Sequence, residues 1–229
     1  MDGQHKDDDS DKATIDRTFG KLRVLASRKL NDSTTLYGLA GSILDYQGDA
    51  MVNAANTGGV TGFGVDERVN RAGGPQLKQA RRALQGIPTG TCKSTPSFDH
   101  VVVQWIIHAV GPVLRDNALS GETTEAKLEQ LAAAYYSCLQ EATRLQCKDI
   151  GFCLLSCGVF RGNVSLEECI TQGLKGMVSF VKQKTTSDND ELHPTTICLI
   201  AYTTEEQHAL VESIKKLDLV PVAKTTDSA

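Results

Sequence analysis

The chain has 229 residues, of which 40% are hydrophobic and 23% are charged. This composition is that of a protein with a buried core, and the length fits one domain of ~150 residues with extended ends better than two full domains. Lysine and arginine number 24 against 28 aspartates and glutamates. The net charge of −4 argues against a protein that coats nucleic acid, but backbone N–H groups can bind phosphates without any net positive charge.

Residues 1–18 are predicted to form a solvated acidic tail, and residues 19–229 a single domain. The opening MDGQHKDDDSDK carries five Asp, two Lys and no apolar run. A secretory signal needs a basic start and an apolar middle, and an organellar transit peptide is poor in acids. No stretch approaches the ~18 apolar residues of a membrane helix. We therefore expect a protein of the cytoplasm or nucleus with no membrane attachment.

The predicted elements alternate between strands and helices along the chain. Short apolar runs bounded by Gly, Pro or polar residues predict buried strands at 36–40, 50–53, 101–109, 150–155 and 196–201. Apolar residues at helical spacing predict helices through 128–142, 170–181 and 210–217. Ser165 with Glu168, and Thr203 with Glu206, have the capping-box form that begins a helix. The alternation indicates an α/β fold with a largely parallel sheet covered on both faces, and 184–194 is predicted to be an exposed loop.

The cysteines predict reduced, buried thiols rather than disulfides or a zinc site. Their number is odd, their spacing is irregular, and no C-x-x-C pair occurs. They are Cys92, Cys138, Cys147, Cys153, Cys157, Cys169 and Cys198.

The first candidate site follows the predicted strand at 50–53. That strand ends in Asn53 and Asn56, and a turn with four glycines at 57–66 leads into an expected helix near Val65. Glycine lets a backbone approach a ligand closely, and the free N–H groups of a helix N-terminus bind anions. The segment lacks the Gly-Lys-Ser/Thr of a P-loop and the third glycine of the dinucleotide-binding fingerprint. The sequence of this segment is therefore compatible with a ligand-binding turn of another kind and with a flexible loop.

The second candidate site is the turn at 154–162. It follows the predicted strand at 150–155, contains glycines and precedes the cap at Ser165. Ligands of open α/β sheets bind where strands end. Two such turns on one sheet edge can grip a diphosphate from both sides. Phe160, between the glycines, is either a ligand contact or a core side chain under the loop.

In combination these motifs are highly specific, and the chain resembles the macrodomain family from about residue 36 to residue 214. The motifs are VNAAN at 52–56, GVD at 64–66, RAGGP at 71–75, PTG at 88–90, IHAVGP at 107–112 and SCGVF at 156–160. The resemblance implies a three-layer α-β-α fold with a mixed, largely parallel sheet. It is strongest to the type that removes ADP-ribose from proteins, because Asp66 stands ten residues after Asn56.

The resemblance also implies roles for the matched positions. Asn56 would hold the distal ribose and Asp66 would orient or deprotonate a water, so these two are the expected catalytic residues. Asn53 is expected mainly to tie the loop to the sheet. The expected ligand-binding residues are Ser42, Ile43, Asn53, Gly62, Phe63, Gly64, Val65, Ser156, Cys157, Gly158, Val159, Phe160 and Arg161.

The expected function is hydrolysis that removes mono-ADP-ribose from acidic protein side chains and deacetylates O-acetyl-ADP-ribose. The water would be activated by Asp66 or by a substrate phosphate, and the scheme needs no metal and no cofactor. The expected partners are ADP-ribose and mono-ADP-ribosylated proteins, with no membrane, no nucleic acid and a monomeric state. The alternatives are a non-catalytic module that reads ADP-ribose and a phosphatase acting on ADP-ribose 1″-phosphate.

Five positions depart from the family pattern. Ser42 replaces an Asp that accepts a hydrogen bond from the adenine amine. Thr61, Phe63 and Arg161 stand where Gly is common, and Asn70 replaces a His. The ring of Phe63 would either narrow the distal pocket or swing out over the ligand.

Three further residues are expected to have structural rather than chemical roles. His108 ends an apolar run and is expected to be a satisfied buried histidine rather than a catalytic one. Cys157 is expected to be a small packed residue rather than a reactive thiol, and Trp105 a core residue in mid-strand.

A basic cluster occurs between the two candidate sites. Lys78, Arg81 and Arg82 are expected to form a solvated helix face, with a contact to nucleic acid or poly-ADP-ribose as the alternative.

Overall fold

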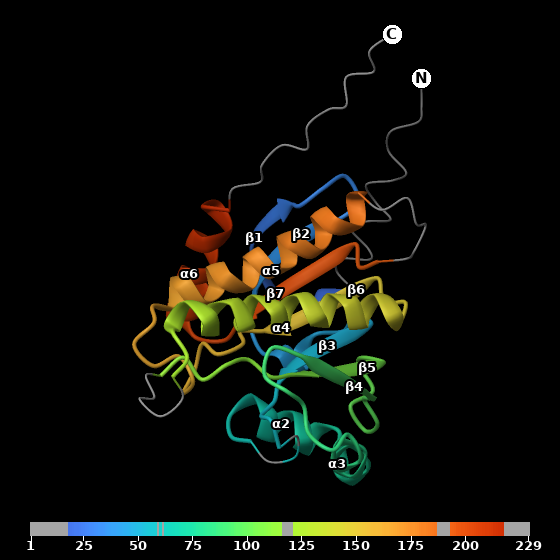
Figure 1. Ribbon diagram of the computed structural model, residues 1–229. Coiled ribbons are helices and arrows are strands. Elements are labelled where there is room, and N and C mark those ends of the chain that lie inside the picture. The colour runs from blue at the N-terminus through green and yellow to red at the C-terminus, as the bar shows by residue number, and fades with distance from the viewer. Residues whose placement is uncertain (1–17, 59, 61, 116–120, 187–192, 218–229) are drawn as a thin grey trace, which may run out of the picture.

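A seven-stranded sheet lies at the centre of the protein (Figure 1). This computed structural model describes residues 18–58, 60, 62–115, 121–186 and 193–217. The strands are β1 (Arg23–Lys29), β2 (Thr35–Ala40), β3 (Ala50–Ala54), β4 (Cys92–Pro96), β5 (Trp105–Ala109), β6 (Asp149–Cys153) and β7 (Thr196–Ala201). Their order is β1-β2-β7-β6-β3-β5-β4. The edge strands β1 and β4 pair antiparallel and the other neighbours pair parallel, so the sheet is mixed and largely parallel, as predicted.

Helices flank this sheet. They are the short 3-10 helix η1 (Ile43–Asp45) and the α-helices α2 (Val65–Ala72), α3 (Gly74–Ala83), α4 (Thr124–Arg144), α5 (Leu166–Thr186) and α6 (Thr204–Lys215). Helix α2 packs on β3, α4 on β4 and β5, and α6 on β1 and β2, while α5 contacts both α4 and α6. The layered α/β architecture predicted from the alternating pattern is confirmed. No helix in the described ranges is long and apolar enough to cross a membrane.

Both predicted helix caps form. The Thr203 hydroxyl accepts the Glu206 N–H at 3.2 Å while the Glu206 carboxylate accepts the Thr203 N–H at 2.9 Å, which completes a capping box. The Ser165 hydroxyl accepts the Glu168 N–H at 3.1 Å at the start of α5. These bonds fix where α5 and α6 begin, and both helices begin close to the carboxyl edge of the sheet.

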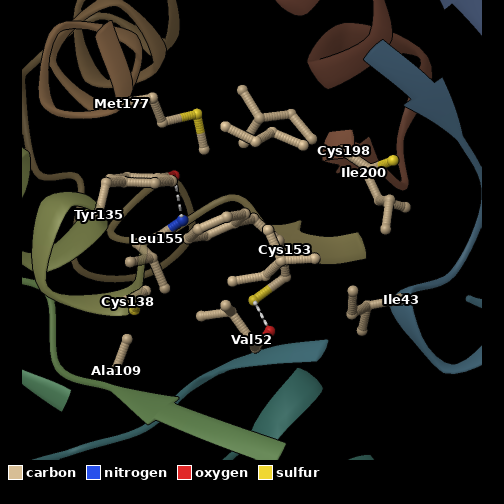
Figure 2. Close-up of a cluster of buried hydrophobic side chains, with 14 of the residues drawn as sticks. Ile43, Val52, Ala109, Tyr135, Cys138, Cys153, Leu155, Met177, Cys198 and Ile200 are labelled. Carbon is tan, nitrogen blue, oxygen red and sulfur yellow. Dashed lines mark hydrogen bonds between the residues drawn. The ribbon is translucent and has the colours of Figure 1, made fainter. Parts of the chain in front are cut away.

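The core explains why the central strands are continuous apolar runs. Parallel strands covered on both faces bury every side chain, and β6 is buried along its whole length. Figure 2 shows part of this core, where the Cys153 thiol donates to the Val52 carbonyl at 3.3 Å and the Tyr135 hydroxyl accepts the Leu155 N–H at 2.9 Å. All seven cysteines are free, and all but the half-buried Cys92 are buried, as predicted.

Three expectations about the elements are wrong in detail. The strand expected at 101–109 begins only at Trp105, which is half-buried at the strand's start rather than in its middle, and Val101 is 83% exposed in a turn. The polar stretch at 184–194 is not all loop, because α5 continues to Thr186. Residues 187–192 of it lie outside the described residues. The sheet also contains β1 and β4, which the apolar pattern did not predict.

The described chain starts within the expected tail. Thr18 is buried, and its carbonyl accepts the Gln47 N–H at 3.0 Å. The remainder of the expected tail, 1–17, lies outside the described residues.

Candidate functional site

A cavity of about 630 Å³ opens at the carboxyl ends of β2, β7, β6 and β3. We call it the site cavity. This volume falls within the ~300–1,000 Å³ typical of small-molecule sites. Two segments contribute to its wall. The first loop, the described residues of 55–64 after β3, lines the cavity at 55, 56 and 62–64, and the second loop, residues 154–165 after β6, lines it at 154, 156 and 158–160. The cavity therefore lies where the sequence pattern predicted a ligand.

The site cavity brings together most of the predicted site residues and leaves out three. Asn53, Cys157 and Arg161 are not among the residues that line it. Those that line it are Ser42, Ile43, Asn56, Gly62, Phe63, Gly64, Val65, Asp66, Ser156, Gly158, Val159 and Phe160.

Several backbone contacts hold the first loop. The Ala55 N–H donates to the Ala109 carbonyl at 2.8 Å, and the Thr57 carbonyl accepts the Ile87 N–H at 3.0 Å. Gly64 has φ 67° and precedes α2 without any side-chain cap. The first N–H groups of α2 are therefore left for another acceptor, and Gly64, Val65 and Asp66 all line the cavity.

Asp66 is held by a buried ion pair at the start of α2. Its side chain is 3% exposed, and its Oδ1 lies 2.7 Å from an Nη of Arg81, whose side chain is fully buried. The Asn53 amide donates to the same oxygen at 2.6 Å. Asn53 thus ties β3 to α2, which is the structural role expected for it. The Asp66 Oδ2 has no hydrogen-bond partner in the described part of the chain.

Gly62 sits tightly against this carboxylate. A Cβ added to Gly62 would lie 2.2 Å from the Asp66 Oδ2, which is far inside van der Waals contact. Position 62 therefore requires glycine for the loop to pass over the carboxylate. The Asp66 Oδ2, unpartnered among the described residues, is therefore buried, and the first loop covers it at Gly62.

The expectation of a solvated basic face on α3 is wrong for Arg81. Lys78 and Arg82 are exposed, but Arg81 is fully buried and reaches toward α2, where it also donates to the Asn70 side-chain oxygen at 2.6 Å. A buried charge needs a partner, and the carboxylate of Asp66 supplies it. Asn70, one of the departures from the family pattern, joins this network and donates to the Val60 carbonyl at 3.3 Å.

Hydrogen bonds with Pro112 and Leu114 anchor the second loop. The Ser156 hydroxyl donates to the Pro112 carbonyl at 2.8 Å, and the Leu114 N–H donates to the Phe160 carbonyl at 2.7 Å. Ser156 has φ 57°, a left-handed conformation that costs a non-glycine residue about 1–3 kcal/mol. The surrounding contacts hold the loop in this shape, with Gly158 and Val159 exposed toward the cavity.

Aromatic and polar side chains complete the cavity wall. Phe160 is half-buried and lines the cavity, so it is not a core side chain, while Phe63 is 94% exposed and swings outward. The Ser42 hydroxyl accepts the Leu44 N–H at 3.3 Å and so caps η1. Arg68, Tyr202 and Glu206 also line the cavity, and the sequence motifs did not indicate them as site residues. The signal for Tyr202 was present, because it directly follows a predicted strand that ends at the same sheet edge.

Burial keeps the nearby thiols protonated. Burial raises the pKa of the Cys153 thiol to about 12. The adjacent Cys169 thiol, together with burial, raises the pKa of Cys157 well above its usual value. Cys157 is therefore a packed, protonated side chain, as predicted. The described residues contain no group of three or more His, Cys, Asp or Glu side chains that could hold a metal ion.

His108 is a satisfied buried histidine, as predicted. Its Nδ1 lies 3.2 Å from the Asn53 amide nitrogen and its Nε2 lies 3.0 Å from the Thr95 hydroxyl. Burial, with a further contribution from the Arg81 charge, lowers the pKa of His108 from 6.5 to about 3. The imidazole is therefore neutral at physiological pH and links β5 to the Asn53–Asp66 network.

The depressed pKa of His108 predicts a pH-dependent stability. The unfolded chain binds a proton below pH 6.5 while folded His108 resists protonation until about pH 3. Stability should therefore fall as pH drops through this window, by up to ~1.4 kcal/mol per pH unit. Urea titrations of the parent and of His108→Gln should show the parent losing more stability between pH 6.5 and 4.5. Parallel slopes for the two proteins would contradict the depressed pKa.

Comparison with known proteins agrees with the motifs and the fold. The Macro domain model matches residues 52–171. A macro domain-containing protein of Ralstonia nicotianae is 41% identical over 128 residues, covering 56% of this chain and 71% of that protein. The ADP-ribose glycohydrolase MACROD2 of Xenopus laevis is 38% identical over 120 residues, covering 52% of this chain but only 27% of that protein.

Solved structures show the same architecture. The Oceanobacillus iheyensis macrodomain with ADP superimposes with a TM-score of 0.69 at 26% identity, covering 83% of this chain and 95% of that one. A variant of that macrodomain with ADPR has the same TM-score and identity, and the match covers 83% of this chain and 97% of that one. The Trypanosoma brucei macrodomain in complex with ADP has a TM-score of 0.65 at 26% identity, covering 78% of this chain and 68% of that one. From its matched sequence and its fold, the chain belongs to the macro domain family.

Proposed function

We propose that the protein binds ADP-ribose in the site cavity and hydrolyses the bond between its distal ribose and an acidic protein side chain. The observation that carries this proposal is the Asp66 carboxylate, which two buried partners fix at the cavity wall while its Oδ2 has no partner in the described residues. The relatives support the ligand, because macrodomains at 26% identity have been solved with ADP or ADPR.

The two loops suit the diphosphate. The uncapped N–H groups at the start of α2 and the glycine backbone of both loops offer donors to phosphate oxygens. The N-terminus of α5 is less available, since Ser165 already caps it. We therefore expect the diphosphate to lie nearer α2 than α5, with the distal ribose toward Asn56 and Asp66.

The proposed reaction is a hydrolysis with one water. The water oxygen bonds to the anomeric carbon of the distal ribose, the bond from that carbon to the acceptor carboxylate breaks, and the carboxylate leaves as an anion. The water proton passes to Asp66 or to a substrate phosphate. Positioning the water and ribose and removing this proton are each worth orders of magnitude in rate. The same site would place a water against the ester of O-acetyl-ADP-ribose.

A reader module without turnover is the second candidate. It is favoured by the engagement of Asp66, whose Oδ1 is shared between Arg81 and Asn53 and whose residue is only 2% exposed. A carboxylate used to hold a loop in place keeps the binding site in shape whether or not it acts on water. Phosphatase action on ADP-ribose 1″-phosphate remains a third prediction.

Two assays separate these candidates. Incubation with a protein carrying mono-ADP-ribose on Asp or Glu should release free ADP-ribose, and calorimetry should show ADP-ribose binding. Binding without release would favour the reader, and neither binding nor release would overturn the proposal.

Ser42 offers a direct test of how the adenine is held. Ser42→Asp should keep the cap on η1, because Asp is as good a capping residue as Ser, and should add a charged acceptor for the adenine amine. We expect ADP-ribose affinity to stay equal or rise up to about tenfold. Calorimetry with the parent and with Ser42→Ala as the control measures this. A marked loss in Ser42→Asp would place the adenine away from Ser42.

A further inference from the structure

Two side chains meet at the site cavity from different elements. Arg68 projects from α2, and Tyr202 directly follows β7. The guanidinium carbon of Arg68 lies over the Tyr202 ring, 5.6 Å from the ring centroid. Both residues line the cavity. Among the described residues that line it, Arg68 is the one cationic side chain.

The two partners differ in how firmly they are held. The Tyr202 N–H donates to the Glu206 carboxylate at 2.8 Å, and the Tyr202 carbonyl accepts from the Gln207 amide at 3.3 Å. These two bonds fix the backbone of Tyr202, while its side chain is substantially open, since the residue is 60% exposed. Arg68 is exposed, and its guanidinium forms no ion pair among the described residues. A long, exposed side chain of this kind can move by a few ångströms at little cost.

We propose that Arg68 and Tyr202 form a two-sided clamp for the base of the nucleotide, in which the guanidinium plane moves outward and stacks on the face of the base opposite Tyr202. This inference rests on the proposed function. Guanidinium and aromatic planes both stack on nucleobases. Two stacking contacts of ~3.5 Å need ~7 Å between the outer planes, so the observed 5.6 Å must open by more than an ångström. We assign that movement to Arg68, because its side chain is the longer of the two and forms no ion pair among the described residues, whereas the Tyr202 backbone is held.

Weak hydrogen bonding at the edge of the base makes stacking on its faces important for affinity. Ser42 offers only a neutral hydroxyl, and that oxygen already accepts the Leu44 N–H. Hydrogen bonding from Ser42 to the edge of the base therefore contributes little affinity. Stacking on the two faces of the base supplies the remaining affinity. Because stacking does not depend on the groups at the edge of the base, the clamp should bind nucleotides of any purine, and not those of adenine alone.

The test compares Arg68→Leu and Arg68→Lys with the parent by calorimetry on ADP-ribose and AMP. Arg71→Leu is the matched control, because Arg71 is an exposed arginine on the same helix, is paired with Glu67 and does not line the cavity. Arg68→Leu should weaken binding of both ligands about 3- to 30-fold. Arg68→Lys should recover little of the loss, because lysine keeps the charge but not the plane. Arg71→Leu should stay within about twofold of the parent. Tyr202→Leu should lose affinity, and Tyr202→Phe should keep it.

Each other result overturns the clamp. Full affinity in Arg68→Lys would make Arg68 a charge contact for phosphate. Tighter binding in Arg68→Leu would mean that the Arg68 side chain obstructs the cavity and that the ligand must displace it. Unchanged binding would mean that Arg68 has no role in binding. A parent that binds neither ADP-ribose nor AMP would instead refute the proposed function itself, which this design keeps distinct from failure of the clamp.

Discussion

Replacing Arg81 with methionine should lower the free energy of unfolding by about 3–5 kcal/mol. The substitution leaves the Asp66 carboxylate buried without its charged partner, 2.7 Å from where the guanidinium was. Desolvating an unpaired charge costs far more than the ion pair contributes when intact. Total stabilities of such domains are ~5–15 kcal/mol, so the loss should be plain in urea unfolding.

A double-mutant cycle separates the pair from simple packing damage. Asp66→Asn should also destabilise the protein, because it leaves the buried guanidinium with only neutral acceptors, the introduced amide oxygen and that of Asn70. The double variant, Asp66→Asn with Arg81→Met, should lose less than the sum of the two single losses, since it buries no unpaired charge. Arg82→Met is the matched control on the exposed side of α3 and should change stability by less than about 0.5 kcal/mol. Additive losses in the cycle would contradict the pairing of Asp66 with Arg81.

Asp66→Asn should slow release of ADP-ribose about 10²- to 10⁴-fold. The asparagine keeps an oxygen where Asn53 and Arg81 donate, so the loop stays in place, but it can neither accept the water proton nor orient the water as strongly. We expect the dissociation constant for ADP-ribose to change only severalfold. Single-turnover release and calorimetry on the same samples measure the two quantities. Asn56→Ala should weaken both, because Asn56 contacts the ribose in this scheme.

Arg81→Met is the control for structural damage in this experiment. It breaks the same ion pair as Asp66→Asn but leaves the carboxylate at the cavity wall. If Asp66 acts on the water, Arg81→Met should lose less rate than Asp66→Asn, and the rate that remains should rise with pH, because a buried carboxyl without its charged partner favours its neutral form. Equal losses of rate in the two variants would mean that Asp66 only supports the first loop. A parental rate in Asp66→Asn would mean that Asp66 takes no part in the reaction.

The apolar pattern predicted the centre of the sheet and missed its edges. Strands β3, β6 and β7 are buried on both faces, so their runs of apolar residues were visible in the sequence. Strand β1 has only exposed and half-buried residues, and β4 is polar and ends in proline, as edge strands commonly do. Such strands are determined by their neighbours and carry no strong local signal.

The candidate site was predictable where its residues follow strands and unpredictable where they come from helix faces. The two loops were located from glycines after buried strands, and both line the cavity. Arg81 looked like part of an exposed basic cluster, because local sequence cannot show that α3 turns this one side chain toward α2. Arg68 and Tyr202 lie far apart in the chain, and only the fold brings their side chains together.

The most direct test of the central claim is a crystal structure of the protein with ADP-ribose. We predict the diphosphate between the first and second loops, and the anomeric carbon of the distal ribose within reach of the Asp66 Oδ2 through one water. A nucleotide bound outside the site cavity, or bound there with its distal ribose turned away from Asp66, would contradict the proposed reaction.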